Sequence, residues 1–306
     1  NPVPMFDPTY RPGDNLFTNS AISYNPDNGN QNWHFQYTPG DWWDYDEIGT
    51  HILFDATVNG QKRTLIAHSA RNGFLYAMER ANGQIVYAKP YFEGINWTKG
   101  IDQKTGKPVD YDPKLDIQVY SGVATPQPGQ PTKRMCPSPS GGNNFWPTAY
   151  SRRTGMLYIP ALTACANFTN RPQDSNAAAR WRGGVQTPTD RYETDMIMAD
   201  PVSGDIKKRQ RVPYPNYAGN LTTAGGLVFT GFTDGTFMAL DDESLEPVWK
   251  INVGTGFNAP PMTFEVGGKQ YIGILSGISG IAAGKHVFTP ELKEQRNQTL
   301  LWVFSL

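Results

Sequence analysis

The sequence repeats one supersecondary pattern, and this repetition limits the possible fold more than any other feature. In its clearest copy, β-rich runs at 226–231 and 234–241 meet at the dipeptide Asp234-Gly235, and a third run covers 247–250. This pattern predicts an antiparallel meander of three strands, because an Asp-Gly dipeptide between β-rich runs favours a tight hairpin. Weaker copies of the pattern lie at 21–33, 73–87 and 196–209.

A single meander leaves an apolar face that only a neighbouring copy can cover, so repeated meanders indicate a repeat architecture. We therefore expect an all-β fold of the β-propeller type, in which four-stranded blades surround an axis. A β-sandwich with similar hairpins is the alternative. Irregular stretches at 98–148 and 165–194 would form loops over the ligand-binding face. No charge run or low-complexity tract marks a linker, so we interpret residues 1–306 as a single domain.

The composition favours a small-molecule partner. Lys and Arg number 27 and Asp and Glu 28, so no basic surface for nucleic acid is expected. No window approaches the roughly 18 consecutive apolar residues that a membrane span needs. The sequence starts at Asn1 without Met, which suggests a processed start, a fragment or an artificial boundary.

Two carboxylates, Asp44 and Asp46, stand two residues apart in the aromatic segment 40–46. A carboxylate beside Trp and Tyr must be paired, hydrogen-bonded or bound to a cation to remain ionised. The pair therefore suggests a hard cation with oxygen ligands, or a base whose pKa is tuned by its surroundings. The same local sequence is also typical of an Asx-type turn with solvated acids.

The chain has two cysteines, Cys136 and Cys165. Such a pair is compatible with a disulfide, with two buried thiols or with half of a metal site. The four histidines, at 34, 51, 68 and 286, are scattered and lack the spacing of a zinc site. We favour a disulfide, which would place the protein in an oxidising compartment such as a periplasm. Two buried thiols in a cytoplasmic protein are the alternative.

Over essentially all of its 306 residues, the chain resembles the C-terminal half of a pyrroloquinoline quinone (PQQ) dependent alcohol dehydrogenase. This quinoprotein family includes the methanol and ethanol dehydrogenases. The motifs that carry the resemblance follow one another in family order: Asn1-Pro2-Val3-Pro4, Arg11-Pro12-Gly13-Asp14-Asn15, Trp43-Asp44-Tyr45-Asp46, Ala67-His68-Ser69-Ala70-Arg71-Asn72-Gly73, Gly141-Gly142-Asn143-Asn144, and a repeat ending at Trp249. The resemblance implies an eight-bladed propeller, with about half of the blades in this chain.

The resemblance also implies roles for individual residues. Asn1 and Asp44 match metal ligands, and Asp44 matches the catalytic aspartate. Arg71 matches the arginine that contacts the quinone oxygens, and Asn144 matches an asparagine that bonds the cofactor. Asp46 is similar to a second acid in the lanthanide-using branch, where calcium-type members tend to carry a small residue. A trivalent ion favours one more anionic oxygen ligand than calcium does, so we favour a lanthanide over calcium.

Three further positions are expected near the cofactor. Tyr217 stands where several relatives place a tryptophan close to the quinone edge, and Gly280 and Ile281 could line the cofactor or end a strand. The separation of Cys136 and Cys165 resembles that of a disulfide pair in the methanol enzymes.

By this resemblance, an alcohol is oxidised to an aldehyde or ketone by metal-assisted hydride transfer to the quinone. Asp44 would be the base, and Arg71 would stabilise the developing oxygen charge. The implied setting is periplasmic, with a cytochrome c as electron acceptor. The family's metal-ligating glutamate, its adjacent-cysteine disulfide ring and its tryptophan floor belong to an upstream half. We therefore expect a companion N-terminal half, as a separate chain or a missing segment.

Two other functions are compatible with the sequence. A non-catalytic propeller scaffold would keep the repeats but has no reason to retain Asn1, Asp44, Arg71 and Asn144 together. A sugar or polyol quinoprotein would differ only in its pocket and loops.

Overall fold

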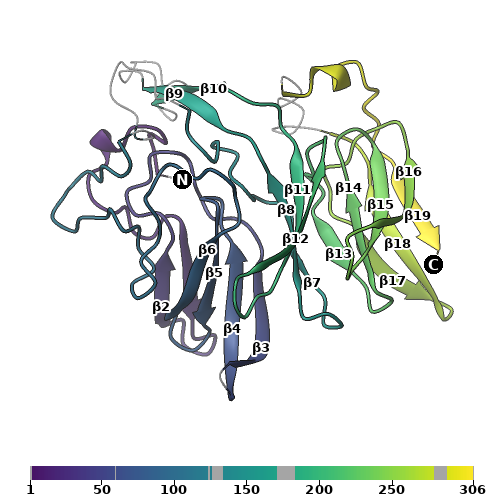
Figure 1. The fold of residues 1–306 in the computed structure, drawn as a ribbon, viewed down its shortest axis with the longest axis horizontal. Coiled ribbons are helices and arrows are strands. Elements are labelled where there is room, and N and C mark those ends of the chain that lie inside the picture. Colours follow the sequence, from purple (N-terminus) through teal and green to yellow (C-terminus); the bar gives the residue numbers. More distant parts are fainter. Residues whose placement is uncertain are drawn as a thin grey trace. The chain divides into compact units, whose positions relative to one another are not determined.

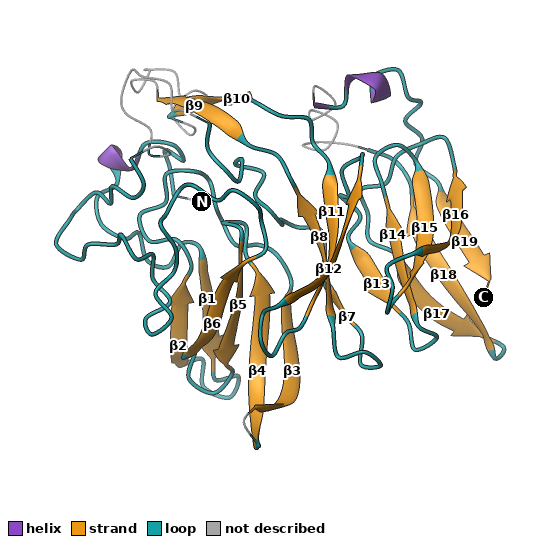
Figure 2. Ribbon diagram, in the orientation of Figure 1, coloured by secondary structure: helices purple, strands orange, loops and turns teal. Residues whose placement is uncertain are grey.

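The computed structural model describes residues 2–58, 60–122, 125, 134–170, 183–278 and 288–305. Strands dominate these residues, and their helical content is limited to the short 3-10 turns η1 (Pro8–Tyr10) and η3 (Pro290–Leu292) (Figure 2). The expected all-β class is therefore confirmed. None of the helices in this part of the chain has the length and apolar character needed to cross a membrane.

The chain divides into two compact units. Unit 1 combines Asn1–Asn144 with Ala164–Asp190, and unit 2 combines Phe145–Thr163 with Arg191–Leu306. Each unit has its own hydrophobic core, built largely from aromatic side chains in unit 1 and from two smaller clusters in unit 2. The interpretation of residues 1–306 as one domain stays a prediction.

Unit 1 contains one four-stranded antiparallel sheet and two hairpins (Figure 1). The sheet has the strand order β3-β4-β5-β6. Its strands are β3 (His51–Val58), β4 (Gln61–Ser69), β5 (Phe74–Glu79) and β6 (Ile85–Pro90). The hairpins are β1 (Ser20–Tyr24) with β2 (Gln31–Gln36), and β9 (Ala166–Asn170) with β10 (Gly184–Pro188).

A contact between tryptophan and glycine joins the first hairpin to the sheet. The indole N–H of Trp33, in β2, donates to the carbonyl of Arg80 at 3.0 Å. Gly83, in the turn between β5 and β6, has φ +71°, and a Cβ there would lie 2.6 Å from the Trp33 ring. The turn needs glycine both for its left-handed backbone and for this close approach. Trp33, at the end of the copy at 21–33, thus packs on the glycine turn of the copy at 73–87.

Unit 2 contains three antiparallel sheets with the orders β12-β11-β8-β7, β13-β14-β15-β16 and β17-β18-β19. The first is formed by β7 (Ala149–Tyr150), β8 (Leu157–Leu162), β11 (Thr194–Ala199) and β12 (Ile206–Val212). The second is formed by β13 (Asn220–Thr222), β14 (Leu227–Gly231), β15 (Thr236–Asp241) and β16 (Pro247–Asn252). The third is formed by β17 (Met262–Val266), β18 (Lys269–Leu275) and β19 (Leu301–Ser305).

The sheets confirm the repeated meanders. The clearest copy forms β14, β15 and β16, with β13 added as a fourth strand. Its turn closes as expected, because the Asp234 carboxylate accepts the Thr236 N–H at 3.0 Å and Gly235 has φ +89°. The weaker copies at 21–33, 73–87 and 196–209 coincide with the hairpins β1-β2, β5-β6 and β11-β12.

The expectation of an irregular segment at 165–194 is wrong in part, because this segment contains the hairpin β9-β10. In β9, Ala166, Phe168 and Asn170 are buried and alternate with partly exposed residues, which is the pattern of a half-buried strand. By contrast, the described residues of 98–148 hold turns and two isolated bridges, Ile101 with Pro108 and Met135 with Ala166.

One face of the third sheet of unit 2 is apolar and exposed. Its other face packs Ile272, Ile274 and neighbouring aromatic rings into the core. On the exposed face, Met262 pairs across Gly273 with Val303, and Leu275 pairs with Leu301. These four apolar side chains are between 44% and 57% exposed. Exposed apolar patches of this kind mark interaction surfaces.

Candidate active site

The loop that carries the two predicted carboxylates is folded by a third acid, Asp41. Its side chain is 1% exposed and accepts the backbone N–H groups of Trp43 at 2.9 Å and Tyr45 at 2.8 Å. The Asx-type turn therefore belongs to Asp41, whose role sequence reasoning missed. Trp43 and Tyr45 are fully buried. Asp44 between them has φ +65°, a left-handed conformation that is uncommon for residues other than glycine.

Asp44 and Asp46 meet the guanidinium of Arg71, which lies in the turn between β4 and β5. Arg71 Nη2 lies 3.4 Å from Asp44 Oδ2, and Nη1 forms an ion pair with Asp46 Oδ1. The side chains of Asp44, Asp46 and Arg71 are only 16%, 24% and 10% exposed. The acids are thus partly buried and paired, and the alternative of solvated acids in a turn is wrong.

The far side of the Arg71 guanidinium is held by backbone. Its Nε and Nη2 donate to the Pro139 carbonyl at 2.8 and 2.6 Å. Gly141 has φ +78°, and a Cβ at this position would lie 2.1 Å from Arg71 Cγ. Any larger residue at Gly141 would therefore displace the arginine side chain. The Gly141-Gly142 pair of the sequence motif is explained by this close approach.

Asn144 belongs to the same segment as Pro139. Its side chain is 8% exposed and donates from Nδ2 to the Ser140 carbonyl at 3.0 Å. Asn143 beside it donates to Ser69 Oγ, at the end of β4, at 2.8 Å. Segment 139–144 thus packs against the end of β4 that leads into the Arg71 turn.

The other predicted cofactor and metal positions are Asn1, Tyr217, Gly280 and Ile281. Asn1, Gly280 and Ile281 lie outside the described residues. Tyr217 belongs to unit 2, where its ring centroid lies 5.1 Å from that of Trp146. It is 2% exposed, and no described residue hydrogen-bonds to its hydroxyl. Burial raises the pKa of this phenol well above its ordinary value.

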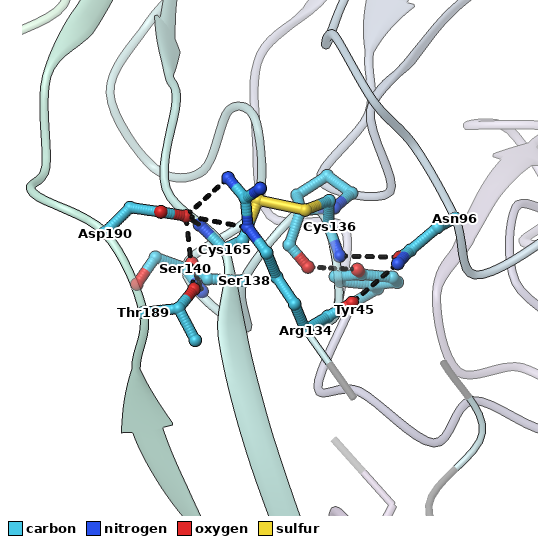
Figure 3. The surroundings of a disulfide bond; sticks show 10 residues. Tyr45, Asn96, Arg134, Cys136, Ser138, Ser140, Cys165, Thr189 and Asp190 are labelled. Atoms are coloured by element: carbon cyan, nitrogen blue, oxygen red, sulfur yellow. Dashed lines mark hydrogen bonds and ion pairs between the residues drawn. A yellow bond between two sulfur atoms is a disulfide. The ribbon is translucent and has the colours of Figure 1, made fainter. Parts of the chain in front are cut away.

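The disulfide between Cys136 and Cys165 is confirmed, with an Sγ–Sγ distance of 2.08 Å (Figure 3). It joins Cys136, in the stretch between β6 and β7, to Cys165, the residue before β9. The Cys136 N–H donates to Asn96 at 2.8 Å, and the Cys165 N–H to Asp190 at 3.2 Å. The next residue, Pro137, accepts the Tyr45 hydroxyl at 2.6 Å. The crosslink therefore anchors the segment that holds both Tyr45 and Arg71.

A buried network beneath Arg71 was missed by sequence reasoning. The Glu47 side chain is 1% exposed; its carboxyl lies 2.8 Å from His68 Nε2 and accepts the Arg71 backbone N–H at 2.9 Å. The His68 ring stacks on His51 with centroids 3.9 Å apart, and the Tyr37 hydroxyl lies 2.9 Å from His51 Nε2. The two histidines, far apart in sequence, are cross-strand partners in β3 and β4.

A hydrogen bond to the backbone places a proton on one nitrogen of His68. His68 Nδ1 lies 3.2 Å from the Thr50 carbonyl, which can only accept, so Nδ1 carries a proton. Burial lowers the pKa of His68 to about 4 and raises that of Glu47 well above its ordinary value. Burial thus disfavours the charged form of both groups. Glu47 follows the Asp-Tyr-Asp motif directly, and this adjacent acid was the available sequence signal.

The cluster of Asp44, Asp46 and Arg71 suits a cation bound beside an anionic ligand. Its donors are carboxylate oxygens, the ligands that hard cations take, and two carboxylates with one guanidinium leave a net negative charge. Within the described ranges, no group of three or more His, Cys, Asp or Glu side chains forms a metal site. A hard cation takes about six to eight oxygens, so Asp44 and Asp46 supply part of a coordination sphere. The residues present therefore fit the metal and quinone that the sequence predicts.

Repeated four-stranded antiparallel sheets of this kind form the blades of β-propellers. The profile of the PQQ glucose/ethanol/alcohol dehydrogenase β-propeller domain matches residues 1–89 and 187–272. The chain therefore belongs to this family.

Individual relatives agree. The chain is 32% identical to the quinoprotein alcohol dehydrogenase PedH of Pseudomonas putida, over 100% of this chain and 51% of that protein. It is 34% identical to the lanthanide-dependent methanol dehydrogenase of Methylacidiphilum fumariolicum, over 88% of this chain and 43% of that protein. A europium-containing methanol dehydrogenase structure matches 96% of this chain and 54% of its own, with a TM-score of 0.84 and 29% identity. The chain thus spans about half the length of these relatives, and the propeller-type fold is confirmed.

Proposed function

We propose that this chain, assembled with an N-terminal propeller half, is a periplasmic PQQ-dependent dehydrogenase that oxidises an alcohol to an aldehyde or ketone. The observation that carries the proposal is the convergence of Asp44, Asp46 and Arg71 in one partly buried cluster. Family membership supports it, and the disulfide supports an oxidising compartment.

In the proposed reaction, Asp44 takes the proton of the substrate hydroxyl as general base. The Arg71 guanidinium, 3.4 Å from Asp44, stabilises negative charge on the acid and on a bound oxygen. Bound PQQ would accept the two electrons of the oxidation, with the metal ion as Lewis acid. A cytochrome c is the proposed next acceptor.

The proposed residues that hold PQQ are Arg71 and Asn144, with Tyr217, Gly280 and Ile281 as further neighbours. The proposed metal ligands are Asn1, Asp44 and Asp46, with a lanthanide favoured over calcium. The Asp46 carboxylate already pairs with Arg71, so its charge would be shared between the guanidinium and the ion. The second acid supplies the extra negative charge that a trivalent ion requires.

Reconstitution tests this function. The assembled protein, stripped of metal and cofactor, is titrated with PQQ in the presence of La³⁺, Ca²⁺ or no metal. We expect a bound-quinone absorption spectrum with either metal, tighter binding with La³⁺, and dye-linked oxidation of simple alcohols. Metal analysis of the protein as isolated gives an independent answer. Failure to bind PQQ with either ion would favour a non-catalytic scaffold, and a preference for sugars or polyols would change the substrate class.

The exposed apolar face of the β17-β18-β19 sheet supports the proposal of a companion half. We expect this chain to form a one-to-one complex with the N-terminal half of the propeller, measured by size-exclusion chromatography with light scattering. Phe264, on that face and 39% exposed, provides the test. Phe264→Asp should weaken the complex, whereas Asn28→Asp, the same charge change in an exposed hairpin turn, should not. A stable soluble monomer that binds no partner would contradict the proposal.

A further inference from the structure

The proposed chemistry uses Asp44, Asp46 and Arg71 but gives no task to Glu47, whose side chain is 1% exposed. Its carboxyl accepts the backbone N–H of Arg71 at 2.9 and 3.1 Å, and it also accepts the N–H of Asn72. A buried carboxyl is costly unless its oxygens are used, so these bonds are its structural purpose.

The turn that carries Arg71 is held by a different group at each backbone position. The Tyr91 hydroxyl donates to the Ala70 carbonyl at 2.7 Å, and the Gly142 N–H to the Arg71 carbonyl at 3.0 Å. The Trp97 indole N–H donates to the Asn72 carbonyl at 2.8 Å. These three donors bind the backbone carbonyls of the turn. Glu47 instead accepts the backbone N–H groups of Arg71 and Asn72.

Glu47 is itself held in place by His68. The His68 ring sits three residues before Arg71, at the end of β4, with Nε2 2.8 Å from Glu47 and Nδ1 3.2 Å from the Thr50 carbonyl. Stacking on His51, at 3.9 Å and an interplanar angle of 1°, fixes the plane of the ring. The orientation of the Glu47 carboxyl, which accepts the Arg71 N–H, is therefore fixed by His68.

We propose that Glu47 and His68 are positioning residues that set the direction of the Arg71 side chain. Through Arg71 they set the affinity of the site for PQQ. Only the effect on PQQ binding rests on the proposed function. The effect on the Arg71 turn can be measured without cofactor. A small rotation of the backbone at Arg71 would move the guanidinium away from Asp44, Asp46 and the Pro139 carbonyl, because the side chain is long.

The test compares Glu47→Met with Glu47→Gln in the assembled protein. Methionine has a similar length but cannot accept the two N–H bonds. Glutamine keeps a carbonyl acceptor for Arg71 and an N–H donor for His68 Nε2. We expect hydrogen exchange of the peptide covering 69–73 to become about tenfold faster in Glu47→Met and to stay near wild type in Glu47→Gln. Unchanged exchange in Glu47→Met would overturn the proposal.

The second readout is PQQ affinity, measured by quenching of tryptophan fluorescence. We expect the dissociation constant to rise about tenfold in Glu47→Met and to recover in Glu47→Gln. In the Arg71→Ala background, Glu47→Met should cause no further loss, because a positioning residue acts through Arg71. An equal loss in both backgrounds would overturn the proposal. If Arg71→Ala itself leaves PQQ binding unchanged, the proposed function fails, while the exchange result still decides the role of Glu47.

Two further variants separate positioning from loss of stability. Asp242 is a fully buried acid of unit 2, paired with Arg153, and Asp242→Asn should lower the melting temperature without changing PQQ affinity. If Glu47→Met does not fold, His68→Leu removes the partner of Glu47 and leaves its acceptor oxygens, and faster exchange at 69–73 with weaker PQQ binding is again expected. Wild-type values for both in His68→Leu would overturn the pairing.

Discussion

Replacing Asp44 by asparagine is expected to reduce kcat for alcohol oxidation by about 10²- to 10⁴-fold, the range that a general base contributes. The change removes the proposed base but keeps the size of the side chain. Asparagine also tolerates the left-handed backbone of Asp44, at φ +65°, better than other uncharged residues, so little strain is added. The variant therefore separates loss of chemistry from loss of fold. The measurement is dye-linked alcohol oxidation by the assembled, metal-loaded protein.

Two controls accompany this variant. Asp55→Asn removes a carboxylate whose side chain is 75% exposed and paired at the surface with Arg80, and it should leave turnover unchanged. Asp44→Ala should be inactive and also less stable than Asp44→Asn, because alanine is strained at positive φ. Normal turnover in Asp44→Asn would refute the assignment of Asp44 as base, even if PQQ still binds.

Removing the disulfide is expected to produce the largest loss of stability. Cys136 and Cys165 are 29 residues apart in sequence, and the chain-entropy relation for a loop of this length gives about 3–4 kcal/mol of unfolding free energy. The double variant Cys136→Ser, Cys165→Ser avoids a leftover thiol. Its unfolding free energy, measured by denaturant titration of the assembled protein, should fall by that amount.

The wild-type protein with a reducing agent is the matched comparison. Reduction should lower the stability of the wild type toward that of the double variant and should leave the double variant unchanged. The crosslink also anchors Pro137 and Pro139, whose carbonyls bind Tyr45 and Arg71. We therefore expect weaker PQQ binding in the double variant at temperatures where it is still folded. Equal stability with and without the disulfide would contradict this account of the loop.

The local patterns of the sequence predicted the parts of this protein that depend on neighbours in the chain. The Asp234-Gly235 hairpin follows from turn chemistry, and the Asp44–Asp46 pair was visible as two acids among aromatic residues. The segment 165–194 was misjudged because β9 is short and its partner β10 lies on the far side of a long insertion. Alternation over five residues is too weak a signal when the pairing strand is distant in sequence.

The sequence by itself determined the class of fold and pointed to Asp44, Asp46 and Arg71, because repeats, turns and motifs consist of consecutive residues. Only the tertiary structure decided what each acid does. Asp41 folds the loop, Asp44 and Asp46 face Arg71, and Glu47 lies beneath the Arg71 turn with His68. The reason is physical: burial and hydrogen-bond partners set the behaviour of a carboxyl group, and these partners come from β4, the turn after it and segment 137–144.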